Sequence, residues 1–324
     1  MSPAVLVTGA AGYLGSTLVE SLAARRQAGN GPTRLVATDV REVPAAQRLA
    51  GVDYLVHDVR NAGLGAELRA RGIDTVVHLA AIVTPGPVSN RELEYAVDVQ
   101  GTRNVLDACL EAGVRRLIVT SSGAAYGYHA DNPAWLTEEH PVRGNAEFAY
   151  SHHKRLVEEM LADARSRHPG LEQVVFRVGT ILGETTRNQI TALFERRRLL
   201  AIRGAPSPFV LIWDRDVVGA IEHAIDGGPS GIYNVAGDGA LTLAQIAARL
   251  GKPLVTVPAS VLRAVLALLH PLRLTRYGPE QVNFLRYRPV LDNRRLKETF
   301  GYVPRLTSAE VFELYCRSHE LGPR

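Results

Sequence analysis

The stretch AVLVTGAAGYLG occupies residues 4–15. Its first five residues are apolar or β-branched and predict a buried strand, and the apolar spacing that follows predicts a helix: Leu14, Leu18, Val19 and Leu22. A buried strand that leads through a glycine turn into a helix is typical of a dinucleotide-binding site. Gly9 permits the tight turn, Gly12 lets backbone N–H groups approach a pyrophosphate, and Gly15 lets the helix pack on the strand. A simple glycine turn without a ligand is the alternative until other residues join the pattern.

The composition is that of an ordinary globular chain. Its 324 residues can bury a large core, as one large α/β domain or as a large domain with a smaller one. The net charge is only +4, and the densest basic run, Arg196-Arg197-Arg198, fits a solvated helix face, so we expect no nucleic-acid partner. The two cysteines, Cys109 and Cys316, show no metal or redox spacing, which predicts no metal site and a reduced, cytoplasmic chain.

No segment predicts stable insertion into a membrane. The chain enters its first strand at once, so we expect no signal peptide. The most apolar stretch, Val261 to Leu269, is interrupted by Arg263 and is too short to span a bilayer. We expect a lid helix or a buried helix there, with loose membrane contact as the minor alternative.

Strands and helices alternate along the first half of the chain. Residues 34–38, 53–57, 74–79 and 116–121 read as further strands, and residues 92–112 and 150–165 read as helices. Alternation at this spacing predicts a doubly wound parallel α/β sheet.

Acidic residues stand at the ends of two of these strands. Asp39 follows the second strand, where a carboxylate accepts hydrogen bonds from the ribose hydroxyls of NAD and repels the 2′-phosphate of NADP. Arg41 complicates this preference, since a guanidinium two residues further on accommodates a phosphate. A capping Asp in a loop is the alternative for Asp39. Asp58 and Val59 follow the third strand, where we expect the Asp58 carboxylate to contact the adenine amino group.

The candidate chemistry lies at the end of the fifth strand and on the helix that follows. The strand ends in Thr120-Ser121-Ser122, and Tyr150 and Lys154 occur on the next helix. Residues four apart share one helical face, and an ammonium beside a phenol favours the phenolate, which makes the tyrosine an acid or base usable near neutrality. An isolated Tyr-x-x-x-Lys pair often occurs by chance, but here it follows a glycine turn, an acidic strand end and a serine strand end in order.

Together these motifs resemble the extended short-chain dehydrogenases/reductases, also called the NAD-dependent epimerase/dehydratase family. The resemblance covers most of the chain and rests on TGAAGYLG at 8–15, HLAA at 78–81, GTRNVLDAC at 101–109, TSSGAAYG at 120–127, FRVGTILG at 176–183 and GIYNVAG at 231–237, with Asp39, Asp58-Val59, Tyr150 and Lys154. It implies a Rossmann domain over residues 1–180, joined by a returning segment near 214–237, and a smaller C-terminal substrate-binding lobe over residues 181–324. It also implies NAD as cofactor, a small-molecule substrate and a homodimer formed through the helices at 92–112 and 150–165.

The resemblance also implies roles for individual residues. Ser122 orients the substrate oxygen, Tyr150 exchanges its proton, and Lys154 holds the nicotinamide ribose. Ser122 is chosen over Ser121 because it lies four residues before Tyr126. The implied cofactor-binding residues are Gly9, Gly12, Tyr13, Leu14, Gly15, Asp39, Asp58, Val59, Leu79, Ala80, Ala81, Tyr150 and Lys154. The implied substrate-binding residues are Ser122, Gly123, Thr180 and Asn188.

Three departures from the family pattern bear on the reaction. Ser122 is followed by Gly123 and Ala124 where dehydratases of sugar nucleotides have Asp and Glu, so the acid and base needed to eliminate water are missing. Phe209 stands where sugar-nucleotide epimerases usually carry an arginine for the diphosphate. Asp98 stands where relatives usually have asparagine, which leaves its hydrogen bonding open.

The sequence therefore predicts an NAD-dependent oxidoreductase that moves hydride between nicotinamide and a carbon bearing a hydroxyl or carbonyl. The first alternative is an epimerase that keeps its NAD and returns the hydride to the opposite face of a sugar. The second is a cofactor-sensing protein without turnover, which the intact Ser122, Tyr150 and Lys154 disfavour. The segment from Arg273 to Arg288, rich in arginine and tyrosine, is interpreted as a loop and helix that close over the substrate, or else as a surface segment.

Overall fold

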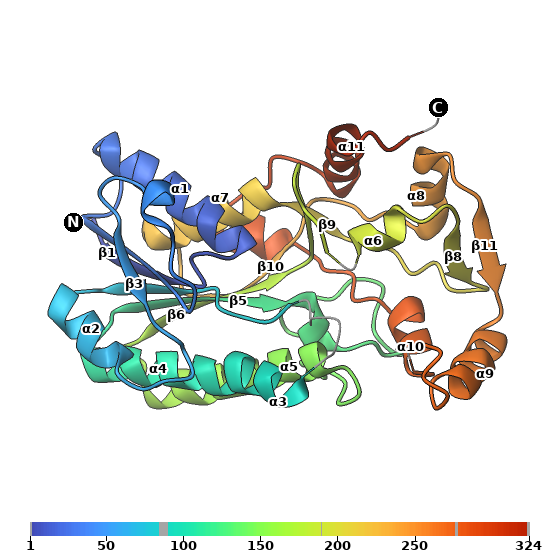
Figure 1. The fold of residues 1–324 in the computed structure, drawn as a ribbon, viewed down its shortest axis with the longest axis horizontal. Coiled ribbons are helices and arrows are strands. Elements are labelled where there is room, and N and C mark those ends of the chain that lie inside the picture. Colours follow the sequence, from blue (N-terminus) through green and yellow to red (C-terminus); the bar gives the residue numbers. More distant parts are fainter. Residues whose placement is uncertain (1, 84–89, 189, 276–277, 323–324) are drawn as a thin grey trace.

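Seven parallel strands form the central sheet of the protein (Figure 1). The computed structural model describes residues 2–83, 90–188, 190–275 and 278–322. The strands are β1 Ala4–Thr8, β2 Arg34–Asp39, β3 Asp53–Val56, β4 Thr75–His78, β5 Arg116–Ser122, β6 Glu172–Val178 and β10 Gly231–Val235. They lie in the order β10-β6-β5-β4-β1-β2-β3. The chain changes direction across the sheet between β1 and β4, and ligands of such sheets bind at the carboxyl ends of the strands beside that point.

Helices cover both faces of this sheet because its strands are apolar on both sides. Val5 and Val7 of β1 pack with α1 and α7 on one face, whereas Leu6 packs with α2, α4 and α5 on the other. These helices and the short turns between them are α1 Tyr13–Gln27, α2 Leu64–Arg71, α3 Arg91–Tyr95, a π-helical turn Ala96–Gln100, α4 Gly101–Ala112, a 3₁₀ turn Gly123–Tyr126, α5 Ala149–Arg167 and α7 Asp214–Ile225. The predicted doubly wound parallel α/β fold is confirmed.

A smaller lobe follows the carboxyl ends of the strands (Figure 1). It contains two parallel strand pairs, β7 with β9 and β8 with β11, and its core gathers around Phe194, Phe312 and Tyr315. Its elements are β7 Thr180–Leu182, α6 Thr191–Phe194, β8 Leu199–Ile202, β9 Leu211–Trp213, α8 Leu243–Leu250, β11 Leu254–Val257, α9 Ala259–Leu269, α10 Gln281–Arg286, a π-helical turn Leu296–Phe300 and α11 Ser308–Ser318. Helix α7 and strand β10 lie in the predicted returning segment, and β10 pairs with β6. The proposed boundary at residue 180 stays a prediction.

Helix α9 corrects one expectation. The sequence allowed a buried helix over Val261 to Leu269, but none of the residues of α9 is buried, and the side chains of Val261 and Leu268 are 52% and 67% exposed. The apolar run does not serve the core, and the buried-helix interpretation is wrong. Within the described ranges, no helix is both long and apolar enough to cross a bilayer.

Candidate active site

The glycine turn after β1 packs directly against the end of β4. Gly9 has a φ of +67°, and a Cβ on it would stand 2.7 Å from the backbone nitrogen of Ala80. A Cβ on Gly15 would overlap the carbonyl oxygen of Gly9. Both positions therefore require glycine. The turn lies against Leu79 and Ala80, and the N–H of Leu79 donates to the carbonyl of Thr8 at 3.3 Å.

Helix α1 begins directly after this turn. Gly12 is its N-terminal capping residue, and no side chain of the described residues caps the helix. A helix start with unsatisfied N–H groups favours an anion, because the groups and the helix dipole both point at it. Leu14 packs against the core below and fixes the first turn. The residues of the turn thus fit a pyrophosphate cradle.

Tyr13 links the glycine turn to the small lobe. Its phenol donates a hydrogen bond to Oδ2 of Asp214 at 2.5 Å and lies 2.7 Å from Oγ1 of Thr186. Burial and the Asp214 carboxylate raise the pKa of Tyr13 to about 12, so the phenol keeps its proton at neutral pH. The contact ties the cradle to the first residue of α7 and to the loop after β7.

Asp39, at the end of β2, faces the same turn. Its Oδ2 accepts the N–H of Ala11 at 3.0 Å, and its Oδ1 accepts the backbone N–H of Arg41 at 3.0 Å. The Arg41 side chain folds over both, since Nε donates to Asp39 Oδ1 at 3.2 Å and Nη2 donates to the Ala11 carbonyl at 2.7 Å. A small hollow beside the pair is lined by Ala10, Ala37, Asp39, Arg41, Glu42, Val43, Arg48, Tyr54, Leu55 and Val56. This is where the adenosine half of a dinucleotide would lie on the predicted assignment.

Replacing Asp39 with alanine is expected to relax the preference for NAD over NADP. The variant loses the acceptor for the ribose hydroxyls and the charge that repels a 2′-phosphate, so we expect the ratio of the two Kd values to fall by about tenfold or more. Titration of both dinucleotides at moderate salt measures it. Asp39→Asn keeps an acceptor for the Ala11 N–H, so it distinguishes the effect of the lost charge from the effect of a changed loop conformation. Wild-type protein that binds NADP as tightly as NAD would contradict the assignment and direct attention to Arg41.

Asp58 and Val59 follow β3 at the same edge of the sheet. Arg60 Nε donates to both carboxylate oxygens of Asp58, at 3.0 and 2.9 Å, and this hydrogen bonding holds the pKa of Asp58 below its usual range. Asn104 of α4 donates to the Val59 carbonyl at 2.9 Å. The segment is therefore fixed in place, and the contact of Asp58 with an adenine amino group stays a prediction.

The three predicted catalytic residues lie at the end of β5 and on the helix that packs against it. Tyr150 and Lys154 lie on the first turns of α5, with Lys154 Nζ 5.6 Å from the centroid of the Tyr150 ring. The same ammonium, largely buried, donates to the carbonyl of Thr120 at 2.9 Å. Two residues further along β5, Ser122 Oγ accepts the N–H of Ala124 and begins the turn that leads away from the sheet. Lys154 thus joins the tyrosine to the strand that carries the serine.

Asp98 has a definite place in this site that the sequence left open. It lies in the π-helical turn between α3 and α4, where its Oδ1 accepts the N–H of Ile82 at 2.8 Å and its Oδ2 lies 3.1 Å from His153 Nδ1. Both side chains are buried. The carboxylate joins the loop after β4 to α5 at the residue before Lys154. Two acceptor oxygens suit a position with a donor on each side, which accounts for aspartate here.

A buried ion pair lies beside β5, the strand that carries Ser121 and Ser122, and the sequence did not predict it. Arg177 of β6 and Glu158 of α5 meet with Nη2 2.6 Å from Oε2, and Ser121 Oγ donates to the other glutamate oxygen at 2.5 Å. Arg177 Nη1 also donates to the Tyr126 hydroxyl at 2.8 Å, and that hydroxyl lies 2.8 Å from Asn234 Oδ1. The network locks β5, β6, β10 and α5 together under the site. The partners are far apart in sequence, so spacing alone gave no signal.

The predicted substrate residues are less closely gathered. Gly123 lies under Leu291, since a Cβ on it would stand 3.1 Å from the leucine side chain. Thr180 begins β7 and donates its N–H to Val210 at 3.1 Å. Asn188 Oδ1 accepts the N–H groups of Ile190 and Thr191 at 2.8 and 2.9 Å, just before α6. A substrate role for each of them stays a prediction.

Arg288 packs against Phe209, the residue that stands where sugar-nucleotide epimerases usually carry an arginine. Its Cζ lies 4.0 Å from the Phe209 ring centroid and 4.6 Å from that of Phe284. Its Nε and Nη2 are buried and make no hydrogen bond to any described residue. Tyr128 packs on Phe284, with 5.0 Å between ring centroids. Burial raises the pKa of Tyr128, Arg288 opposes that rise, and the neighbouring Tyr150 adds to it. The guanidinium therefore packs between Phe209 and Phe284, and Phe284 in turn contacts Tyr128.

The segment from Arg273 to Arg288, from which this arginine comes, is only partly described. Residues 276 and 277 lie outside the described residues. The rest contains α10, of which Val282 is buried and which packs on α9. The arginines and aromatic residues of the segment indicated a functional role, but the sequence did not distinguish Arg288 from the other arginines. Closure of the segment over a substrate stays a prediction.

The chain is similar to known proteins in sequence and in fold. The model of the NAD dependent epimerase/dehydratase family matches residues 5–236. An uncharacterized protein of Mycobacterium tuberculosis is 28% identical over 98% of this chain and 85% of its own. A short-chain dehydrogenase/reductase superfamily protein of Agrobacterium tumefaciens, solved with bound NAD, is 25% identical with a TM-score of 0.69 and covers 98% of this chain and 97% of its own. The UDP-glucose 4-epimerase of Thermotoga maritima, solved with UDP-glucose, has a TM-score of 0.73 at 20% identity and covers 98% of each chain.

Proposed function

The chain belongs to the NAD-dependent epimerase/dehydratase family, and we propose that it is a dehydrogenase that moves a hydride between nicotinamide and a carbon bearing a hydroxyl or carbonyl. The single observation that carries the proposal is the position of Lys154, whose Nζ lies 5.6 Å from the Tyr150 ring and donates to Thr120 of the strand that ends in Ser122. A cationic group beside a phenol at the carboxyl edge of a Rossmann sheet supplies a proton donor and acceptor next to a dinucleotide.

The residues of this chain fit NAD along the whole edge. The glycine turn and the uncapped start of α1 would hold the pyrophosphate, Asp39 the adenosine ribose, and Lys154 the nicotinamide ribose. The chemistry that NAD supplies when bound is hydride transfer at C4 of the nicotinamide.

The protein side chains would handle the proton and the geometry. Ser122 Oγ would hydrogen-bond the substrate oxygen and orient its carbon. Tyr150 Oη would take the hydroxyl proton during oxidation, or return it during reduction. Lys154 would stabilise the phenolate form of Tyr150 by its positive charge. Asp98 and Glu158 would keep α5 in position through His153 and Arg177.

Arg288 supports a substrate with an anionic group. A charged guanidinium with two buried and unpartnered nitrogens is costly to keep, and a carboxylate or phosphate would satisfy both in one fork. Arg288 also favours the second candidate, an epimerase acting on a nucleotide sugar. Its guanidinium can bind a diphosphate, whereas the Phe209 side chain cannot.

Absorbance at 340 nm separates the two candidates. A dehydrogenase releases NADH as it consumes substrate, so the absorbance rises with added NAD and alcohol. An epimerase returns the hydride and shows no net change, while chromatography finds the epimer. If no substrate gives either an absorbance rise or an epimer, the result favours a cofactor-sensing protein without turnover.

We also propose a homodimer through the helices at 92–112, which include α3 and α4, and through α5, and a cytoplasmic location in keeping with the two free cysteines. Several apolar residues of these helices, such as Val105 and Leu161, are buried in the core and are not available for a contact between subunits. Leu93 and Tyr95 of α3 support the proposal better, because their side chains are 37% and 40% exposed. Light scattering at micromolar concentration should give twice the chain mass, and Leu93→Asp should give the monomer. A monomeric mass for the wild type would contradict the dimer.

A further inference from the structure

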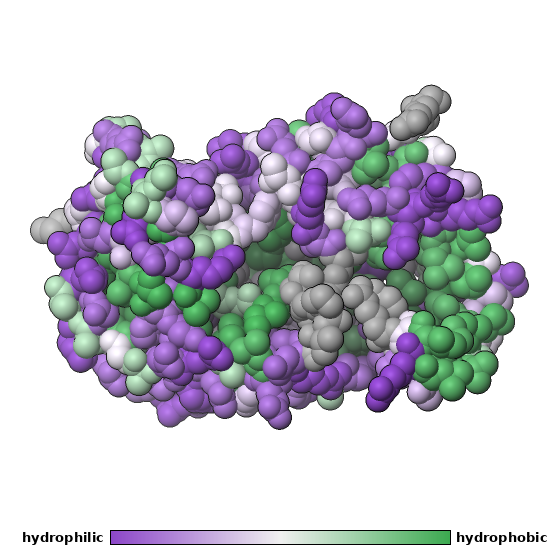
Figure 2. All heavy atoms as spheres, in the orientation of Figure 1, coloured by the Kyte–Doolittle hydropathy of each residue, from purple (hydrophilic) through white to green (hydrophobic). Residues whose placement is uncertain are grey.

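Exposed apolar side chains gather at the far end of the small lobe. Figure 2 shows this apolar surface at the end of the molecule where Figure 1 places α9. The apolar patch consists of Leu200 on β8, Val255 on β11, and Val261, Val265, Leu268, Leu272 and Leu274 on α9 and the turn after it. Leu272 and Leu274 are 61% and 71% exposed. A contiguous apolar surface of this kind marks an interaction site.

The patch has the spacing of a single helical stripe. Val261, Val265 and Leu268 follow one another at intervals of four and three residues, which places them on one side of α9, and Leu272 lies in the turn after the helix. Leu200 and Val255 are directly paired across β8 and β11, so they extend the stripe on the neighbouring sheet. With 11 residues, α9 is too short to span a bilayer and long enough to lie along its surface.

The charges around the patch are mostly positive. No Asp or Glu occurs between Asp238 and Glu280, although the chain has 33 acidic residues. The same interval carries Arg249, Lys252, Arg263 and Arg273. Strand β8 is preceded by the exposed run Arg196-Arg197-Arg198, with the exposed Glu195 before it, and is followed by the exposed Arg203. An apolar stripe with a predominantly basic border is complementary to anionic headgroups over acyl chains.

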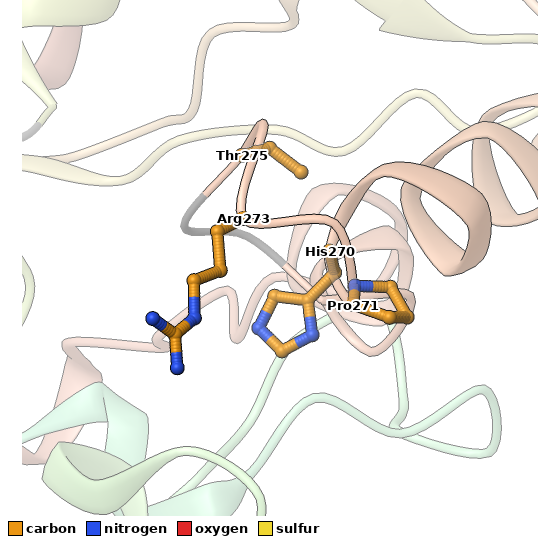
Figure 3. A pocket seen from close by; sticks show the side chains of 4 residues that line it. All are labelled: His270, Pro271, Arg273 and Thr275. Carbon is orange, nitrogen blue, oxygen red and sulfur yellow. The ribbon is translucent and has the colours of Figure 1, made fainter.

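A cationic hollow adjoins the stripe. It has a volume of about 480 Å³ and is lined by His270, Pro271, Arg273 and Thr275. Figure 3 shows the imidazole of His270 and the guanidinium of Arg273 pointing to the same side of the loop. A headgroup phosphate suits such a pair, since Arg273 supplies charge and His270 a hydrogen-bond donor.

We propose that this patch binds reversibly to the surface of an anionic lipid membrane, with α9 lying in the interface and the arginines at the headgroups. A second copy of the chain fits less well. A symmetric contact would bring Arg263 and Arg273 of two copies together without an acidic partner in the interval, and like charges at a buried contact oppose association.

Co-sedimentation with lipid vesicles tests the proposal, and it needs neither substrate nor cofactor. The full chain is mixed with vesicles of phosphatidylcholine alone or with about one third phosphatidylglycerol, at low and at high salt. Binding is expected to the anionic vesicles, to fall at high salt and to be weak on phosphatidylcholine. Leu268→Asp should lower the partition constant by about tenfold or more, because it places a charge in the apolar layer.

Val303→Asp is the matched control, since Val303 is 64% exposed but lies outside the patch. It should leave vesicle binding within about twofold of the wild type, and melting curves confirm that both variants are folded. Failure of the wild type to sediment with anionic vesicles would overturn the proposal. So would equal loss in both variants, or a wild-type dimer that Leu268→Asp makes monomeric without any vesicle binding. If Leu268→Asp does not fold, the dependence of wild-type vesicle binding on salt and on anionic lipid still tests the proposal.

Discussion

Tyr150→Phe is expected to lower turnover by about 10²–10⁴-fold, the usual contribution of general acid–base catalysis. The substitution removes the only proton that the side chain can transfer while keeping the ring and its packing. Lys154 stays in place because its hydrogen bond goes to Thr120 and not to the phenol. Affinity for NAD should therefore change little, and the loss should fall on kcat.

Two companion variants distinguish this role from a structural one. Lys154→Ala should reduce both turnover and NAD affinity, because the ammonium serves the tyrosine and the nicotinamide ribose. Ser122→Ala should reduce turnover and leave cofactor binding unchanged. If the three residues were structural, each variant would lose melting temperature and activity together. A folded Tyr150→Phe protein with a near-normal rate would rule out the mechanism.

Glu158→Ala is expected to lower the free energy of unfolding by about 3–5 kcal/mol, as removal of one partner from a buried ion pair does. Burial opposes the charge on Arg177, and the Glu158 carboxylate outweighs it, so the pKa of Arg177 lies above its ordinary value. Without Glu158 the guanidinium stays charged in a buried place, and Ser121 also loses its acceptor. Denaturant unfolding followed by circular dichroism measures the change.

Asp163→Ala provides the control on the same helix. Asp163 pairs with Arg167 at the surface of α5, where both side chains are more than half exposed, so its loss should cost less than about 1 kcal/mol. Glu158→Gln should fall between the two, because an amide oxygen still accepts from Ser121. A cost for Glu158→Ala no larger than that of Asp163→Ala would show that the buried network does not stabilise the fold.

The sheet and the cofactor edge were predictable because their signals are local. A buried apolar strand, a glycine turn and a helical stripe all lie within about twenty consecutive residues, and parallel strands bring their carboxyl ends to one edge. Tyr150 and Lys154 were predictable for the same reason, since four residues on a helix fix their shared face. Asp39 followed from its place at a strand end.

The contacts that shape the site were not predictable in this way. Asp98 and His153 are 55 positions apart, and Arg177 meets Glu158 only because β6 lies beside α5. Arg288 reaches Phe209 across the small lobe, where no repeating pattern fixes the position of one segment against another. Apolar periodicity marked α9 as a helix but does not say whether its partner is the protein core or something outside it.

The most direct test of the proposed function is absorbance at 340 nm with NAD and a panel of alcohols, in which each phosphorylated or carboxylated compound is paired with its neutral analogue. Wild-type protein should raise the absorbance with at least one anionic alcohol and less with its neutral partner, and Tyr150→Phe should not raise it measurably. Protein that binds NAD but leaves the absorbance flat and every compound chemically unchanged would contradict hydride transfer at this site.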